Sequence, residues 1–398
     1  MSNRTTAGAE AERSEATRRL DSAADDLVEL SHRIHAHPEL GFEEHRSSAW
    51  CAEALEAGGF DVEREAGGIP TAFHARVGDG ALRVGICCEY DALPEIGHAC
   101  GHNVIAAAAV GAGLARAPLA SSLGLRVEVL GTPAEEGGGG KIIMLERGVF
   151  DGIHAAMMVH PFPDELVQMP CLAVSHFTVH YSGKAAHASA FPELGVNAAD
   201  ALTVAQVAIG LLRQHASPGD QVHGIVTNGG AAPNVVPARA SGRFYVRSRD
   251  LDRLATWEPK IRRCFEAGAL ASGAGLEMID ESPRYSEFRT DEAIAARYRA
   301  NAEALGRSFT APGERPLTAS TDMANVSLAI PAIHPTLGLG SAPVVNHQPE
   351  FAAFCATPVA DKAMLDGAAA MAWTVIDLAT GEVERERLLG GWSAAADA

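Results

Sequence analysis

The 398-residue sequence lacks the features that mark nucleic-acid-binding, secreted and membrane proteins. It has no excess of positive charge, since 32 Lys and Arg face 50 Asp and Glu for a formal net charge of −18, and this disfavours nucleic acid and anionic membrane partners. Residues 1–20 contain no apolar stretch of the kind found in secretory signals. The longest apolar run, residues 104–115, is too short to cross a bilayer. We expect a cytoplasmic protein.

A disulfide framework is also missing from the sequence. The cysteines are odd in number and scattered without regular spacing, which indicates a reducing compartment in which most of them are ordinary core residues. They are Cys51, Cys87, Cys88, Cys100, Cys171, Cys264 and Cys355.

The length of the chain exceeds what one hydrophobic core usually supports, so we expect two domains. Residues 1–20 resemble a flexible tail. Residues 21–171 and 287–398 are expected to form one domain, which carries the candidate catalytic residues. Residues 172–286, where strand-like and amphipathic helical segments alternate, are expected to form an inserted α+β domain.

The fold class follows from short apolar runs that begin near Thr71 and end in polar or glycine-rich residues. These runs indicate buried strands, and helical stretches such as "NVIAAAAVGAGLARA" lie between them. Strands that alternate with helices predict an α/β domain with a mixed, mainly parallel sheet and flanking helices. In such a sheet, ligands bind at the carboxyl ends of the strands.

Five residues with metal-binding side chains follow successive predicted strands. Cys100 and His102 lie in "HACGHN", Glu136 in "GTPAEEGGGG", His160 in "MMVHP" and His347 in "VVNHQPEF". No zinc-finger module has ligands this far apart, because structural sites need close ligand pairs. A site assembled from several strand ends is instead typical of a catalytic metal, which keeps positions open for water and substrate.

Five ligands of mixed type are too many for one tetrahedral ion and suit two. Two divalent ions roughly 3.5–4 Å apart can share a hydroxide and stabilise a tetrahedral intermediate. A thiolate combined with imidazole and carboxylate ligands favours zinc; manganese is the next expectation, and cobalt and nickel remain open.

The adjacent residues Glu135 and Glu136 are expected to have different roles. In extended backbone, neighbouring side chains point to opposite sides, so only one of the two is expected to bind a metal in the usual way. We assign Glu136 to the metal and Glu135 to proton transfer as the catalytic base. Asp91 in "EYDALP" is expected to orient a ligand histidine.

Each of these signals has an ordinary structural explanation when it is taken alone. A single histidine is usually structural, Cys100 could be a core residue, the glutamate pair could belong to a loop, and Asp91 could cap a turn. The joint pattern favours function, because the candidates fall in order at successive strand ends.

With these residues in place, the sequence resembles the dinuclear metallopeptidases of peptidase family M20, which include aminoacylases, carboxypeptidases and indole-acetyl-amino-acid amidohydrolases. The match covers roughly residues 30–375. It is carried by "HRIHAHPELGFEE", "DALPEIGHACGHN", "GTPAEEGGGG", "MMVHP", "GKAAHAS", "PNVVP" and "NHQPEF".

This resemblance implies the five metal ligands named above, with Glu135 as catalytic base. It also implies that the inserted domain is a lid that forms a homodimer interface. His187 is then expected to reach across the dimer to stabilise the oxyanion, while Asn234 and Arg247 face the amide or carboxylate of the substrate. Ordinary surface roles for His187 and Arg247 remain open.

One residue departs from the branch of the family that has aspartate after "CGH", since this chain has Asn103. The segment "EIGHACGHN" resembles more closely the sequences of aminobenzoyl-glutamate hydrolases and of dipeptidases that cleave β-alanyl or related dipeptides. The resemblance therefore does not imply activity on plant-hormone conjugates.

The leading hypothesis is a metal-dependent hydrolase that cleaves the amide bond of an N-acyl or N-aminoacyl amino acid. A second hypothesis is deamination or dechlorination-type hydrolysis of an aromatic substrate at the same metal site, which would release ammonia or halide. A third is a non-catalytic scaffold; the sequence disfavours it, because neither Glu135 nor any ligand is missing.

Overall fold

The computed structural model describes residues 2–310 and 319–391 and divides into two compact units. Unit 1 contains Met1–Pro170 and Phe288–Ala398, and unit 2 is Cys171–Glu287. Each boundary lies one residue from the position expected from the sequence. Residue 1 of the expected tail and residues 311–318 and 392–398 of the expected catalytic domain lie outside the described residues.

Unit 1 is built on a six-stranded mixed sheet with strand order β1-β2-β4-β3-β5-β11. Strands β4, β3, β5 and β11 run parallel, whereas β2 pairs antiparallel with β4 and with β1. This confirms the predicted mixed, mainly parallel sheet. The strands are β1 (Asp61–Arg64), β2 (Phe73–Val77), β3 (Leu82–Cys88), β4 (Leu125–Gly131), β5 (Ala155–Met157) and β11 (Ala332–Ile333), and a separate parallel pair consists of β6 (His160–Phe162) and β12 (Thr336–Gly338).

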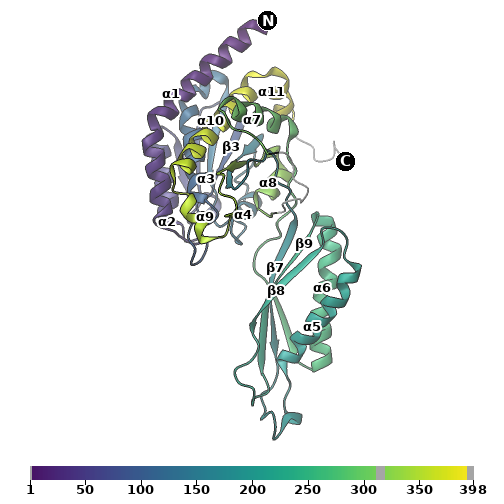
Figure 1. Ribbon diagram of the computed structural model, residues 1–398. Coiled ribbons are helices and arrows are strands. Elements are labelled where there is room, and N and C mark those ends of the chain that lie inside the picture. The colour runs from purple at the N-terminus through teal and green to yellow at the C-terminus, as the bar shows by residue number, and fades with distance from the viewer. Residues whose placement is uncertain (1, 311–318, 392–398) are drawn as a thin grey trace. The chain divides into compact units, whose positions relative to one another are not determined.

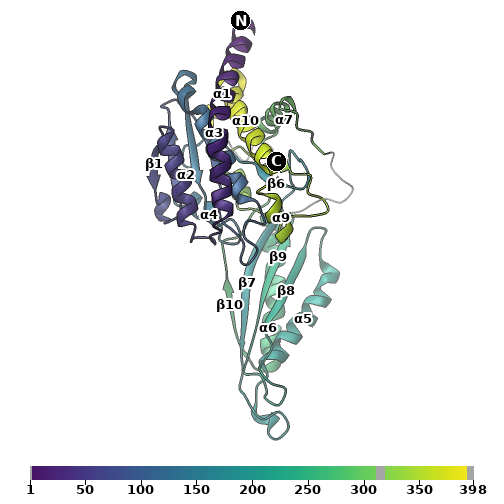
Figure 2. The ribbon, with the colours of Figure 1, turned by 60° about the vertical axis from the view of Figure 1, so that its left-hand side comes forward.

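Nine α-helices of the described part of unit 1 accompany this sheet. They are α1 (Ser2–His35), α2 (His45–Ala57), α3 (His102–Arg116), α4 (Gly140–Glu146), α7 (Glu292–Ala304), α8 (Met323–Ala329), α9 (Pro349–Phe354), α10 (Pro358–Thr380) and α11 (Glu382–Leu389). The two views show α1, α3 and α10 side by side, and their residues are in contact (Figures 1 and 2).

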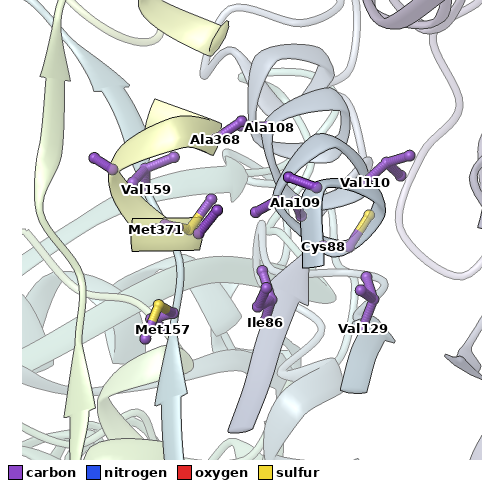
Figure 3. Close-up of a cluster of buried hydrophobic side chains, with 14 of the residues drawn as sticks. Ile86, Cys88, Ala108, Ala109, Val110, Val129, Met157, Val159, Ala368 and Met371 are labelled. Atoms are coloured by element: carbon purple, nitrogen blue, oxygen red, sulfur yellow. The ribbon is translucent and has the colours of Figure 1, made fainter. Parts of the chain in front are cut away.

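Helix α3 is buried along nearly its whole length, which explains its apolar sequence. Its small residues let neighbouring elements approach closely: a β-carbon at Gly113 would lie 2.7 Å from Cγ2 of Val129, and one at Gly111 would lie 2.9 Å from Cδ1 of Leu27. Figure 3 shows alanines of α3 among buried side chains of the sheet and of α10. The start of this helix is therefore held firmly by packing.

The expected flexible tail at residues 1–20 is wrong for the described part of that segment. Helix α1 begins at Ser2, Ala16 and Leu20 are buried, and Arg13 forms an ion pair of 2.6 Å with Asp377 of α10. The charged composition misled the sequence interpretation, because charged residues such as Arg18 and Arg19 are exposed on a long amphipathic helix whose apolar face packs on the rest of unit 1.

Unit 2 is a four-stranded antiparallel sheet with strand order β10-β7-β9-β8 and two long helices on one face (Figure 2). Asn197 and Asp250 cap the two helices through their side chains. This confirms the predicted additional α+β unit. Its main elements are β7 (Ala173–Ser182), α5 (Ala198–Leu212), β8 (Gln221–Asn228), β9 (Arg239–Ser248), α6 (Leu251–Ser272) and β10 (Gly275–Asp280).

Throughout residues 2–310 and 319–391, no helix combines the length and apolar character needed to cross a membrane.

The packing of α1 can be tested with Leu20→Ala. Leu20 is 5% exposed, so its truncation is expected to lower the free energy of unfolding by about 2–5 kcal/mol. Urea unfolding followed by fluorescence measures the change. The exposed neighbour Asp21 provides the control, because Asp21→Ala should change stability by no more than about 0.5 kcal/mol. Equal stability of the two variants would show that this helix does not pack on unit 1.

Candidate active site

The five predicted metal ligands converge in unit 1. One group of possible ligand atoms comes from Cys100, His102 and His160, and another from Cys100, Glu136 and His347. Within each group the atoms lie within 4.8 Å of one another, and Sγ of Cys100 is 3.4 Å from Nε2 of His160. The thiol of Cys100 belongs to both groups, so it lies where two ions could share it.

Local backbone geometry places these side chains. Gly101 precedes α3 with a positive φ of 80°, and a β-carbon there would lie 2.6 Å from Cγ of Pro161. Only glycine fits this position easily, and it allows the ligands on either side of it to approach β6, where His160 is the first residue. His347 has a positive φ of 67°, and its backbone N–H donates to the carbonyl of Ala99.

The two adjacent glutamates lie in a turn after β4, not in extended backbone as the sequence interpretation assumed. Ala134 has a positive φ of 56°, and the N–H of Gly137 donates to the carbonyl of Glu135. Both carboxylates consequently fall in one group of ligand atoms with His102. The argument that neighbouring side chains must point to opposite sides is therefore wrong here.

Asp91 contacts His102 as expected for an orienting carboxylate. Its Oδ1 lies 3.0 Å from Nδ1 of the imidazole, and its Oδ2 accepts a hydrogen bond of 2.9 Å from the backbone N–H of Glu136. A proton on Nδ1 that is donated to Asp91 leaves the lone pair of Nε2 directed at the other ligands. Asp91 thus fixes one ligand ring and the turn that carries another ligand.

The donor set fits divalent metal ions. Nε2 of His102 is buried and has no hydrogen-bond partner among the described residues, and Oε1 of Glu136 lies 3.2 Å from Nε2 of His347. Buried polar atoms normally have partners, and leaving them unpaired is costly. Thiolate, imidazole and carboxylate groups within 4.8 Å of one another are the ligands that zinc and related ions take.

Glu135 occupies an environment that suits a general base. One oxygen of its carboxylate lies 4.0 Å from Nε2 of His102. Burial raises the pKa of this carboxyl well above its ordinary value, and the nearby carboxylates of Glu89 and Glu136 add to the shift. A carboxylate with a raised pKa accepts a proton more readily than an exposed one.

Three further charged residues beside this cluster were missed from the sequence. Glu89 follows β3, Lys141 lies at the start of α4, and Asp322 precedes α8; none has exposed side-chain surface. Glu89 could have been noticed, since it lies two residues before Asp91 at the same strand end. Lys141 was harder to recognise than Glu89, because a single charge at the start of an apolar helix is a weak indication of a buried functional residue.

A buried histidine, His334, was also missed. Its ring centroid is 5.5 Å from that of His160, and neither ring nitrogen has a hydrogen-bond partner within the described part of the chain.

The residues expected to bind substrate belong to unit 2, whereas the predicted metal ligands belong to unit 1. His187 and Asn234 are exposed and lie close together, since the N–H of Ala188 donates to the carbonyl of Asn234 and His187 pairs with Val235. Arg247 lies on β9, where its Nε donates to Nε2 of His223.

Comparison with known proteins identifies the class and then the family. A model described as "Peptidase family M20/M25/M40" matches residues 88–375. The Xaa-Arg dipeptidase of Mus musculus is 37% identical over 380 residues, which cover 91% of this chain and 88% of that protein. One of the subunits of p-aminobenzoyl-glutamate hydrolase from Escherichia coli is 34% identical, with coverage of 63% and 56%. The crystal structure of an aminobenzoyl-glutamate utilization protein from Klebsiella pneumoniae has the same fold, with a TM-score of 0.70, 18% identity, and coverage of 89% and 96%.

The chain is therefore a metal-dependent hydrolase of the class that cleaves amide bonds in N-acyl or N-aminoacyl amino acids. It belongs to peptidase family M20/M25/M40. The family and the hydrolytic activity predicted from the sequence are both confirmed.

Asp91→Asn tests whether the contact of Asp91 with His102 supports metal binding. Loss of the charge that orients His102 is expected to weaken metal binding by about 10–100-fold. Competition with a chromophoric chelator measures the affinity. Asp79→Asn, at an exposed position in the same unit, should bind metal like the parent chain. An Asp91→Asn chain with parental affinity would contradict the orienting role.

Proposed function

We propose that this enzyme is a dinuclear metallo-dipeptidase or aminoacylase in which Glu135 is the catalytic base. The observation that carries the proposal is the meeting of the five predicted ligands in two groups that share Cys100. The first ion would be held by Cys100, His102 and His160. The second would be held by Cys100, Glu136 and His347. Zinc or manganese is the expected metal, with cobalt or nickel as alternatives.

Bound divalent ions would polarise the amide carbonyl and lower the pKa of water at neutral pH. The residues of the chain do the rest. Glu135 takes a proton from the attacking water and passes it to the nitrogen of the leaving amine. Asp91 keeps His102 in one orientation through the 3.0 Å contact, and the buried position of Glu135 excludes competing solvent from its carboxylate.

For the substrate, we propose a dipeptide with a basic carboxyl-terminal residue as the leading class. The similarity to the Xaa-Arg dipeptidase of Mus musculus extends over most of both chains, which supports this choice. The net charge of −18 also favours the approach of a cationic substrate. N-acyl amino acids and aminobenzoyl-glutamate are the other members of the class to compare.

A homodimer formed through unit 2 completes the proposal. Among the residues that the structure describes, strand β8 pairs only with β9 and lies at the edge of its sheet, and its Ile225 and Val226 are exposed. The exposed Val207 and Leu211 on α5 add apolar surface. An unpaired strand edge with exposed apolar side chains favours pairing with a second copy.

The positions of the substrate-binding candidates support such a pairing. Arg247 pairs with Val174 at one end of the β7–β9 ladder, whereas Ser182 pairs with Arg239 at the other end. The loops that carry His187 and Asn234 continue beyond that second end, so roughly 26 Å of strand separates them from Arg247. Two sheets paired antiparallel through β8 would place the His187 end of one copy beside the Arg247 end of the other. His187 would then serve the partner's site and stabilise the oxyanion there.

All seven cysteines are free thiols, which supports our proposal of a cytoplasmic location, where thiols stay reduced.

The activity can be tested with dipeptides ending in Arg, Lys or His, β-alanyl dipeptides, N-acetyl amino acids and aminobenzoyl-glutamate. We expect release of free amino acid from at least one dipeptide after loading with zinc or manganese. Glu135→Gln should keep its metal and lose about 10²–10⁴-fold in turnover, because the proton acceptor is gone. Glu146→Gln on the exposed face of α4 is the control. Near-parental turnover of metal-loaded Glu135→Gln would remove the proposed base.

The dimer can be tested with Ile225→Lys, which places a charge on the β8 edge. Sedimentation velocity should show a dimer for the parent chain and a monomer for this variant, together with a loss of turnover if His187 acts across the interface. Leu270→Lys, at a highly exposed position on α6, should remain dimeric. A parent chain that sediments as a monomer would contradict the proposed assembly.

A further inference from the structure

A buried ion cluster next to the ligand groups carries one inference beyond the five expected ligands. The ammonium of Lys141 lies 2.5 Å from Oε1 of Glu89 and 2.6 Å from Oδ1 of Asp322, and none of the three side chains is exposed. Asp322 also accepts a hydrogen bond from the backbone N–H of Lys141. Lys141 is therefore fully matched by Asp322, and Glu89 adds a negative charge that this cluster does not balance.

The second oxygen of Glu89 points toward the ligands. Its Oε2 lies 3.6 Å from Nε2 of His102. Neither atom has a hydrogen-bond partner within residues 2–310 and 319–391. Nδ1 of His102 faces Asp91, so a neutral ring that donates there presents its Nε2 lone pair to a carboxylate oxygen. These two electron-rich atoms repel each other unless a proton or a metal ion lies between them.

The distance of 3.6 Å between Oε2 of Glu89 and Nε2 of His102 suits two atoms that bind the same metal ion. With bonds of about 2.0–2.2 Å to nitrogen and oxygen, two ligand atoms of a tetrahedral ion lie roughly 3.4 Å apart. We propose that Glu89 is a sixth metal ligand of this enzyme, bound through Oε2 to the ion that His102 holds. Lys141 is then a positioning residue, which fixes the other oxygen of the same carboxylate. This inference rests on the proposed dinuclear site.

The competing explanation is that Glu89 only neutralises Lys141. The two explanations differ in what happens when the other partner of Lys141 is changed. Neither Asp322 nor Glu89 belongs to the groups of ligand atoms described above. Both contact the same ammonium, but Glu89 also lies 3.6 Å from His102. Asp322→Asn is therefore a matched control for Glu89→Gln, since each removes one buried negative charge from Lys141.

The experiment titrates zinc into the metal-free full-length chain by calorimetry and counts the zinc retained after dialysis against a weak chelator. We expect two tightly bound ions for the parent chain and for Asp322→Asn. In Glu89→Gln, one of the two ions should bind at least about tenfold more weakly. Circular dichroism and thermal unfolding show whether each variant is folded.

Two results would overturn the inference while leaving the dinuclear site intact. One is parental binding of both ions by folded Glu89→Gln, and the other is an equal loss in Asp322→Asn. A parent chain that binds no zinc would instead overturn the proposed function together with this inference. If Glu89→Gln does not fold, Glu89→Asp gives the same comparison, because it keeps the charge for Lys141 and draws the carboxylate away from His102. Parental affinity of Glu89→Asp for both ions would then overturn the inference.

Discussion

The mutual repulsion of buried carboxylates is the constraint on which this site depends. Glu89, Glu135 and Asp91 surround His102 in a region from which water is largely excluded. Burial of one unpaired carboxylate is already costly, and adjacent like charges increase that cost. Lys141 balances only part of this charge, since it also faces Asp322. Bound cations would relieve the rest, so the acidity of the site and its affinity for metal have the same origin.

A site of this kind needs a rigid support, because the ligands would otherwise move apart. Cys100 and His102 flank the glycine at which α3 begins, and α3 is buried among the sheet, α1 and α10. The close approach at Gly111 and Gly113 leaves this helix little room to shift. The alanine-rich sequence after "HACGHN" thus has a functional consequence. Because the helix that it forms is held by packing, Cys100 and His102 at its start are held in fixed positions as well.

The sequence predicted most of the fold and the residues that meet in the candidate metal site, and its failures have identifiable causes. Strand ends could be recognised because apolar runs stop abruptly there, which made Asp91 after β3 and His160 after β5 accessible to prediction. His102 was recognised from its spacing to Cys100 before an apolar helix. Glu89 and Lys141 were missed, since a charge beside an apolar run is usually exposed and only the tertiary structure shows that these two are buried. The tail prediction failed at Ala16 and Leu20 because the helix periodicity was obscured by frequent charges. The turn at Glu135 depends on a positive φ at Ala134, which no residue pattern signals.

The geometry of unit 2 limits how a substrate can be recognised. Glu135 and the predicted ligands all belong to unit 1, whereas the candidates for contact with the substrate, His187, Asn234 and Arg247, belong to unit 2. Because roughly 26 Å of strand separates Arg247 from the other two, a dipeptide cannot touch all three in one copy. Either one of these residues has an ordinary surface role, or two copies each contribute one end of the sheet. In the second case, the edge strand β8 would determine the completeness of the active site as well as the assembly.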